Sequence, residues 1–210
     1  MPVIEYQRIA GVRLVPDVCV GARETVRSVV LATEFNDLKD VRSVALDESS
    51  RTSATLVKII FREFLGFEPR WVSSTPNLKQ MLAENDAALL IGDPGMTFQR
   101  QGLNVFDLAG LWRRHTGLGF VFAMWMVGTD ATAPSETIDF VAACEEGLAR
   151  REEIIDRYQP LLGLPRAELH TYLYQNISFS LDAELRAGLE LYYELAHKHG
   201  LIPALKPLNL

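Results

Sequence analysis

Val44-Ala45-Leu46-Asp47-Glu48-Ser49-Ser50-Arg51-Thr52-Ser53 decides the fold, together with the apolar-rich residues 54–64 that follow it. The stretch starts as a short apolar strand, breaks into hydroxyl-bearing residues and then opens a helix. In α/β proteins a strand that turns into a helix in this way presents free backbone N–H groups to an anion. We therefore interpret this turn as a candidate carboxylate-binding corner.

The hydroxyls of the turn have two interpretations. Backbone N–H groups of a first helical turn and the helix dipole favour a bound anion, and the side chains of Ser50, Thr52 and Ser53 would add neutral donors. Alternatively, Ser49 or Ser50 simply caps the helix, as serine commonly does. The local sequence by itself favours the cap.

Composition limits what this corner can belong to. The 210 residues are 48% apolar with a mean hydropathy of +0.06, enough to bury a full core as one domain or two lobes. The net charge of −6 does not favour binding to nucleic acid or to an anionic membrane. No signal peptide is visible, and the longest apolar run, 120–127, is far below the roughly 20 residues that a membrane span needs. We expect a soluble cytoplasmic protein.

The order of elements along the chain predicts an α/β sheet. We expect strands at 27–33, 43–46, 70–72, 87–91, 104–108 and 119–127, short extended pieces at 12–15 and 18–20, and helices at 52–65, 77–84 and 108–116. Strands and helices that alternate at this spacing are typical of a parallel sheet with covering helices. Ligands of such sheets lie beyond the carboxyl ends of the strands. The turn at 47–53 and the turn at 92–97 should therefore share one rim. From 134 onward the pattern is helical, at 135–162, 166–176 and 181–197.

Three further residues are candidate binding groups. Asp93 lies in a second strand-to-helix turn, Gly92-Asp93-Pro94-Gly95, although the local sequence favours its being an N-cap ahead of the proline. The hydroxyl of Ser28 could point into a cleft or bond a neighbouring backbone group. Phe122 could wall an apolar pocket for a ring, although alternate aromatics on a buried strand are more often core.

Standard catalytic templates are not found. The four histidines, His115, His170, His197 and His199, lack the spacing of metal ligands, so we expect no metal. Cys19 and Cys144 fit reduced structural thiols. There is no glycine-rich phosphate loop and no nucleophile elbow.

Taken together, several segments resemble one known family. The chain is similar to the menaquinone-biosynthesis family of the futalosine pathway, and most of all to its chorismate dehydratases. The similar segments, in order along the chain, are residues 28–31, 44–54, 88–93, 107–112, 116–125, 172–177, 189–193 and 200–201. The match runs along essentially the whole chain, whereas each motif alone is unspecific.

The resemblance implies a type II periplasmic-binding-protein-like fold, with two α/β lobes around a cleft and a helical C-terminal part. We expect one lobe at 1–33 and 128–210 and the other at 34–127. The implied reaction is the dehydration of chorismate to 3-[(1-carboxyvinyl)oxy]benzoate without a cofactor. Ser28, Ser50, Thr52, Ser53, Asp93 and Phe122 would bind this dicarboxylate.

The sequence departs from the family at its start. Family members begin with a strand and a Ser-Tyr-x-Asn type loop, whose asparagine is implicated in catalysis, and this sequence has no such segment. The resemblance thus implies an incomplete first lobe, an unassigned catalytic residue and an open question about activity. An unpaired sheet edge would also favour a homodimer.

Two other functions stay open at this point. One is the related lyase that releases 1,4-dihydroxy-6-naphthoate from the cyclic futalosine intermediate, for which we would expect a histidine in the cleft. The other is a non-catalytic protein that binds a small carboxylate.

Overall fold

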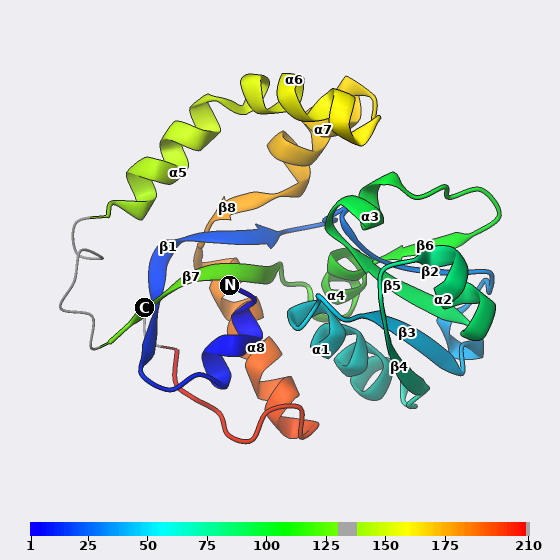
Figure 1. Ribbon diagram of the computed structural model, residues 1–210. Coiled ribbons are helices and arrows are strands. Elements are labelled where there is room, and N and C mark those ends of the chain that lie inside the picture. Colours follow the sequence, from blue (N-terminus) through cyan, green and yellow to red (C-terminus); the bar gives the residue numbers. More distant parts are fainter. Residues whose placement is uncertain (130–137, 209–210) are drawn as a thin grey trace.

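The computed structural model describes residues 1–129 and 138–208 and contains two β-sheets (Figure 1). The smaller has the strand order β7-β1-β8 and the larger the order β4-β3-β5-β2-β6. The strands are β1 (Val12–Ala22), β2 (Val29–Thr33), β3 (Ser43–Asp47), β4 (Arg70–Ser74), β5 (Ala87–Ile91), β6 (Asn104–Asp107), β7 (Phe120–Gly128) and β8 (Ser178–Ser180).

Helices cover both sheets. The α-helices are α1 (Thr52–Ile59), α2 (Leu78–Glu84), α3 (Gly92–Thr97), α4 (Leu108–Thr116), α5 (Phe140–Ala149), α6 (Arg151–Leu162), α7 (Arg166–Thr171) and α8 (Ala183–Lys198). Two short 3-10 helices are η1 (Val3–Gln7) and η2 (Leu38–Asp40), and η3 (Ile60–Leu65) and η5 (Tyr172–Asn176) are π-helical turns that continue α1 and α7. The predicted helix at 52–65 is therefore α1 followed by η3, and it ends at Gly66 with φ of 79°, as expected for a C-terminal glycine.

The larger sheet is mixed, not wholly parallel as predicted. β3 runs parallel to β4 and β5, whereas β2 runs antiparallel to β5 and β6. All five residues of β2 are buried, as its continuous apolar pattern predicts. That pattern shows burial on both faces but carries no information on strand direction, which is why the prediction failed here.

The two sheets divide the chain at other places than the expected lobe limits. The strand at 29–33 was expected in the first lobe, yet β2 lies in the five-stranded sheet. The strand at 119–127 was expected in the second lobe, yet β7 pairs with β1 in the three-stranded sheet, from Val12↔Gly128 to Ala22↔Phe120. The chain thus crosses between sheets at residues 23–28, the first crossover, and at 117–119, the second crossover.

The three-stranded sheet is irregular. The two extended pieces expected at 12–15 and 18–20 form the single strand β1, whose register with β7 shifts between Leu14 and Cys19. Asp17, in the middle of this shift, has φ of 66°. Strand β8 was not predicted, because three residues of mixed polarity carry no strand pattern.

Helix α8 joins the two lobes. The ring of Tyr192 packs edge-on against Trp112 and Phe120, at centroid distances of 6.4 and 5.0 Å. Its hydroxyl donates to the backbone oxygen of Thr52 at 3.0 Å, and Tyr193 donates to that of Val3 at 2.7 Å. Gly188 lies so close to the second crossover that a Cβ would come 2.0 Å from the oxygen of Gly119. One continuous core therefore holds both lobes in place.

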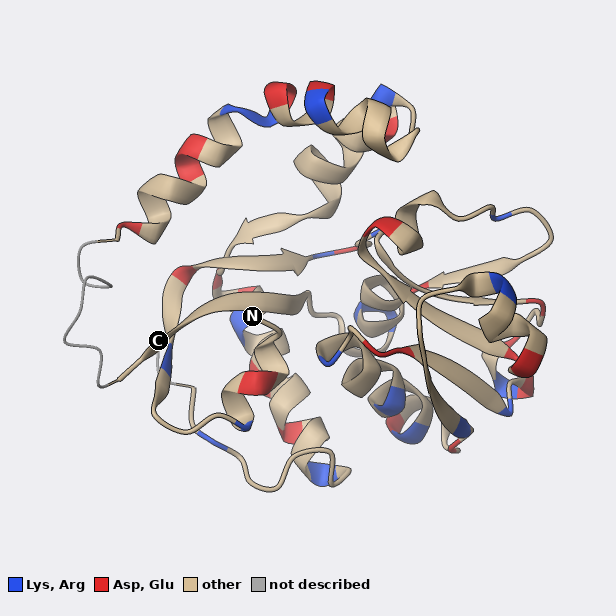
Figure 2. Ribbon diagram, in the orientation of Figure 1, with Lys and Arg blue, Asp and Glu red and all other residues tan. Residues whose placement is uncertain are grey.

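The helical part after β7 forms an arm, which we define as α5, α6, α7 and η5 (residues 140–176). The single helix predicted at 135–162 is two helices that break at Arg150, and residues 135–137 lie outside the described part of the chain. The arm arches from the three-stranded sheet to α3 (Figure 1), and acidic and basic residues alternate along it (Figure 2). Met96 of α3 packs with Ile155 and Leu169 of the arm.

Candidate functional site

The turn after β3 is shaped by Asp47. This buried carboxylate accepts the backbone N–H of Ser49 at 2.9 Å and the Ser49 hydroxyl at 2.6 Å. The N–H of Ser50 donates to the Asp47 backbone oxygen at 3.0 Å. Since β3 and β5 are parallel neighbours, this turn and the turn at Gly92 lie at the same edge of the sheet, as predicted.

The hydroxyls of this turn do not cap helix α1. The N-cap residue is Arg51, and it makes no side-chain capping bond. Ser50 and Ser53 are only 7% and 4% exposed, and within the described part of the chain their hydroxyls have no hydrogen-bond partner. Thr52 Oγ1 accepts the backbone N–H of Ile4 at 3.4 Å, a long bond. The capping alternative is therefore wrong, and two buried hydroxyls are left free to bind a ligand.

These residues line a cavity of about 280 Å³, which we call the serine hollow. Both lobes contribute to it, and its lining residues are Met1, Pro2, Val29, Ser49, Ser50, Arg51, Thr52, Ser53, Ile91, Gly92, Phe122 and Ala123. Phe122 lies at its wall and packs edge-on against Phe120 at 4.7 Å. Both rings belong to the buried core, and Phe122 in addition lines the hollow.

The electrostatics of the serine hollow favour an anion. Arg51 contributes a cationic side chain to the lining, and its guanidinium lies 3.2 Å from Glu5 Oε2 although most of the side chain is exposed. The lining residues given above include no carboxylate, histidine or lysine. The hollow thus contains groups that bind a carboxylate and no general base. Arg51 was not among the predicted binding residues, although a cationic side chain inside the hydroxyl-rich turn could have indicated that it takes part in binding an anion.

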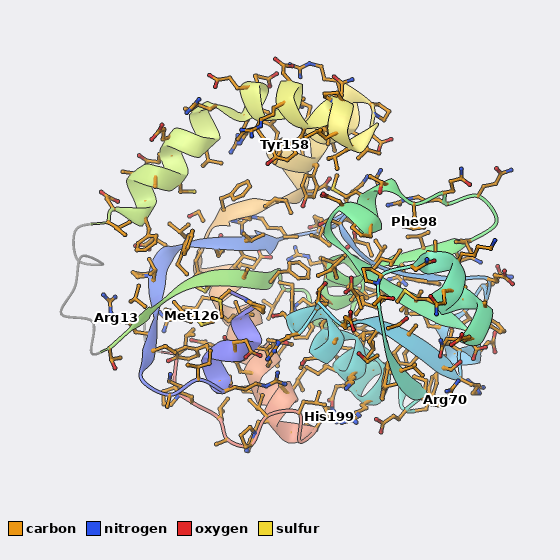
Figure 3. The ribbon with its side chains drawn as sticks, in the orientation of Figure 1. Arg13, Arg70, Phe98, Met126, Tyr158 and His199 are labelled. Carbon is orange, nitrogen blue, oxygen red and sulfur yellow. The ribbon has the colours of Figure 1, made fainter. Side chains whose placement is uncertain are left out.

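Ser28 and Asp93 lie beside the serine hollow and not in it. Ser28 is buried next to Val29, and its Oγ accepts a hydrogen bond from the Tyr172 hydroxyl at 3.0 Å. Asp93 lines a second cavity of about 780 Å³ between α3 and the arm, which we call the arm hollow. Figure 3 labels Tyr158, which also lines it. Gly92 lines both hollows, so the two adjoin there.

Asp93 is poorly suited to hold a carboxylate. It is exposed in the first turn of α3, where the N-cap residue is Ile91, so the expected cap is wrong as well. Its negative charge would repel an anionic ligand, and together with burial it raises the pKa of the nearby Tyr172 hydroxyl. Of the six predicted binding residues, the structure brings four together, namely Ser50, Thr52, Ser53 and Phe122.

The histidines and cysteines lie elsewhere. His115 stacks on Phe64 at 4.5 Å, His170 stacks on Tyr174 at 4.2 Å, and His199 Nε2 lies 2.7 Å from Glu63 Oε2. None of the four histidines lines either hollow. Both cysteines are free, and burial raises the pKa of Cys19 to about 12, which keeps that thiol protonated.

Residues 1–129 and 138–208 contain neither a candidate metal cluster nor a candidate membrane-spanning helix. No group of three or more His, Cys, Asp or Glu side chains there is placed to hold a metal ion. No helix in the same residues is long and apolar enough to cross a membrane.

Sequence comparison identifies the family of the chain. Residues 1–198 match the family described as menaquinone biosynthesis. The chain belongs to this family. It is also 31% identical over 199 residues to the chorismate dehydratase of Thermus thermophilus. This match covers 86% of this chain and 72% of that protein. The family predicted from the sequence motifs is therefore confirmed.

Solved structures confirm the predicted fold class. Protein AF1704 from Archaeoglobus fulgidus superposes with a TM-score of 0.69 at 19% identity, over 92% of this chain and 75% of that one. An ABC transporter protein from Parabacteroides distasonis gives a TM-score of 0.58 at 12% identity, over 95% and 73%. At these identities the similarity concerns the fold alone. The fold is α/β and of the type II periplasmic-binding-protein-like kind.

Proposed function

We propose that this member of the menaquinone-biosynthesis family acts on chorismate as a dehydratase. The observation that carries the proposal is the pair of hydroxyls of Ser50 and Ser53, which have no partner among the described residues and line a hollow to which both lobes contribute. Hydroxyls without a protein partner at the wall of a cavity can donate hydrogen bonds to a ligand carboxylate without breaking a bond within the protein. The chorismate dehydratase of Thermus thermophilus supports the choice of substrate.

The chemistry fits a site made of binding groups. Chorismate loses a ring proton and the neighbouring hydroxyl as water, and the ring becomes aromatic in 3-[(1-carboxyvinyl)oxy]benzoate. Aromatisation supplies the thermodynamic drive, and the elimination is redox-neutral, so the proposal includes no cofactor. The protein has to orient a dianion and stabilise the charge that shifts during elimination.

Five of the six predicted residues have a place in this proposal, and Asp93 has none. The hydroxyls of Ser50, Thr52 and Ser53 and the first turn of α1 hold one carboxylate, with Arg51 at the mouth. Phe122 forms the wall against which the ring lies. Ser28, next in sequence to Val29 of the serine hollow, would donate to the second carboxylate. The group that removes the proton is not assigned, and a catalytic asparagine, a homodimer and a cytoplasmic location stay predictions.

One alternative is favoured by a specific observation. Because the serine hollow has no general base in its lining, binding of a small carboxylate without turnover is the second candidate. The lyase of the same pathway is less well supported, since the histidine expected for it lies in neither hollow.

Incubation with chorismate separates these functions. We expect the aromatic product to appear in chromatography, and Thr52→Val to raise KM about tenfold while the melting temperature stays unchanged. Thr97→Val, at the exposed end of α3, is the matched control and should behave like the wild type. Tight calorimetric binding without product would establish the binding protein instead. Absence of both binding and product would refute the proposal.

A further inference from the structure

The structure assigns a role to Tyr172, which we propose is a positioning residue for Ser28. The inference rests on the proposed function, because it concerns the hydroxyl that holds the second carboxylate. Tyr172 belongs to the arm and is 144 residues away from Ser28 in sequence, yet its hydroxyl lies 3.0 Å from Ser28 Oγ. When tyrosine donates this bond, the serine keeps its own proton for a ligand.

The backbone at Ser28 is held on several sides. The Asp107 carboxylate accepts the N–H groups of Val26 and Arg27, at 3.1 and 2.7 Å. The N–H of Ser28 donates to the Val26 oxygen at 2.7 Å. A Cβ on Gly95 would lie 2.7 Å from the Ser28 carbonyl oxygen, so α3 packs directly against it. With the backbone fixed, the side-chain hydroxyl is the part that still needs an orienting partner.

The arm contacts the first crossover through three side chains on one face. Glu168, Tyr172 and Asn176 are spaced four residues apart, which places them on the same side of α7 and η5. Glu168 forms an ion pair with Arg27, Tyr172 bonds Ser28, and Asn176 Nδ2 donates to Thr25 Oγ1 at 3.1 Å. Arg27 has φ of 67°, a conformation that non-glycine residues seldom adopt unless surrounding contacts hold it.

Tyr172 is suited to act as a permanent donor. It lies in a π-helical turn, and such turns are frequent at functional sites. Burial raises the pKa of its phenol, so the hydroxyl stays protonated across the neutral range. Its ring packs with the apolar side chains around Met96, Ile155 and Leu169, so a phenylalanine would keep the packing and remove only the donor.

Tyr172→Phe tests this role in the full chain. We expect KM for chorismate to rise about three- to tenfold, with kcat within twofold and a small fall in melting temperature, because one hydrogen bond is lost. The matched control is Tyr174→Phe in the same turn, whose hydroxyl bonds Glu152 at 3.0 Å and makes no contact with the crossover, and it should not change KM. In a Ser28→Ala background, Tyr172→Phe should have no further effect.

The outcomes distinguish this inference from the proposed function. A wild-type chain that neither binds nor converts chorismate refutes the proposed function and the inference with it. An active wild type with an unchanged KM in Tyr172→Phe overturns the inference alone. So does an equal rise in KM for Tyr174→Phe, or an effect that adds fully to that of Ser28→Ala, because either would show a general change in the arm.

Discussion

Ser28 and the Ser50–Ser53 turn are both buried serine sites, and they differ in what holds the hydroxyl. Ser28 accepts a hydrogen bond from Tyr172 of the arm, and its backbone is fixed by Asp107 and Gly95. The hydroxyls of Ser50 and Ser53 have no partner among the described residues. The first is a satisfied group, and the second is a pair of unsatisfied groups that a ligand can complete.

This difference separates stability from binding. A satisfied hydrogen bond contributes about 1 kcal/mol to stability, whereas a hydroxyl without a protein partner contributes no such bond. Substitution by alanine should therefore lower the free energy of unfolding at Ser28 and leave it unchanged or slightly raised at Ser50 and Ser53, although substitution at either site weakens ligand binding. The predictions below test that contrast, from the largest effect to the smallest.

Gly95→Ala should have the largest effect on the Ser28 side. The new methyl group would lie 2.7 Å from the Ser28 carbonyl oxygen, which has to move. We expect a loss of about 2–3 kcal/mol in denaturant unfolding and a raised KM for chorismate. Gly147→Ala, on α5 with no atom within 4 Å of the added methyl, is the control and should be neutral or slightly stabilising. Equal stability of the two variants would contradict the close packing around Ser28.

Ser28→Ala should destabilise the protein moderately. It removes the acceptor of the Tyr172 hydroxyl, so about 1 kcal/mol should be lost in the same unfolding experiment. The loss should disappear when Ser28→Ala is measured in a Tyr172→Phe background, because the donor is then absent. A stability equal to that of the wild type would show that this bond is not formed in solution.

Ser53→Ala should stabilise the free protein. The substitution removes a hydroxyl that has no partner among the described residues and places the best helix former in α1, so we expect a gain of up to about 0.5 kcal/mol. Chorismate binding measured by calorimetry should weaken about tenfold in the same variant. A loss of stability would mean that the hydroxyl serves the fold and not a ligand.

Glu63→Gln measures how much a surface ion pair contributes to the free energy of unfolding, for comparison with the two serine sites. Hydrogen bonds from Lys198 and His199 lower the pKa of Glu63, so its contribution is present above the ordinary glutamate pKa and is lost as pH falls through the lowered value. We expect the variant to lose about 0.5 kcal/mol at neutral pH. Wild type and variant should converge in acid urea titrations, and a constant difference at all pH values would contradict this origin.

The sequence predicted the parts of the molecule that depend on neighbouring residues. The β3 turn, the buried strands and the shared rim of β3 and β5 follow from local patterns of apolar, hydroxyl and glycine residues, and so does the presence of Ser50, Thr52 and Ser53 in one turn. Resemblance to a family added the fold class, which solved structures confirm.

The predictions that failed concern features that depend on contacts between segments distant in sequence. The direction of β2 and the sheet that contains β7 are set by pairing partners, and an apolar pattern does not identify those. The Ser28–Tyr172 bond joins residues 144 apart, so no local motif could show it. Asp93 was selected for its place in a turn, but its negative charge and its position in the arm hollow do not fit a carboxylate site.

The measurement that tests the central claim most directly is calorimetric titration of chorismate into the wild type and into the Ser50→Ala/Ser53→Ala double variant. If the serine hollow binds a dicarboxylate, the wild type should bind one chorismate per chain and the double variant should bind at least tenfold more weakly while remaining as stable as the wild type or more so. Equal affinity in a folded double variant would contradict the account.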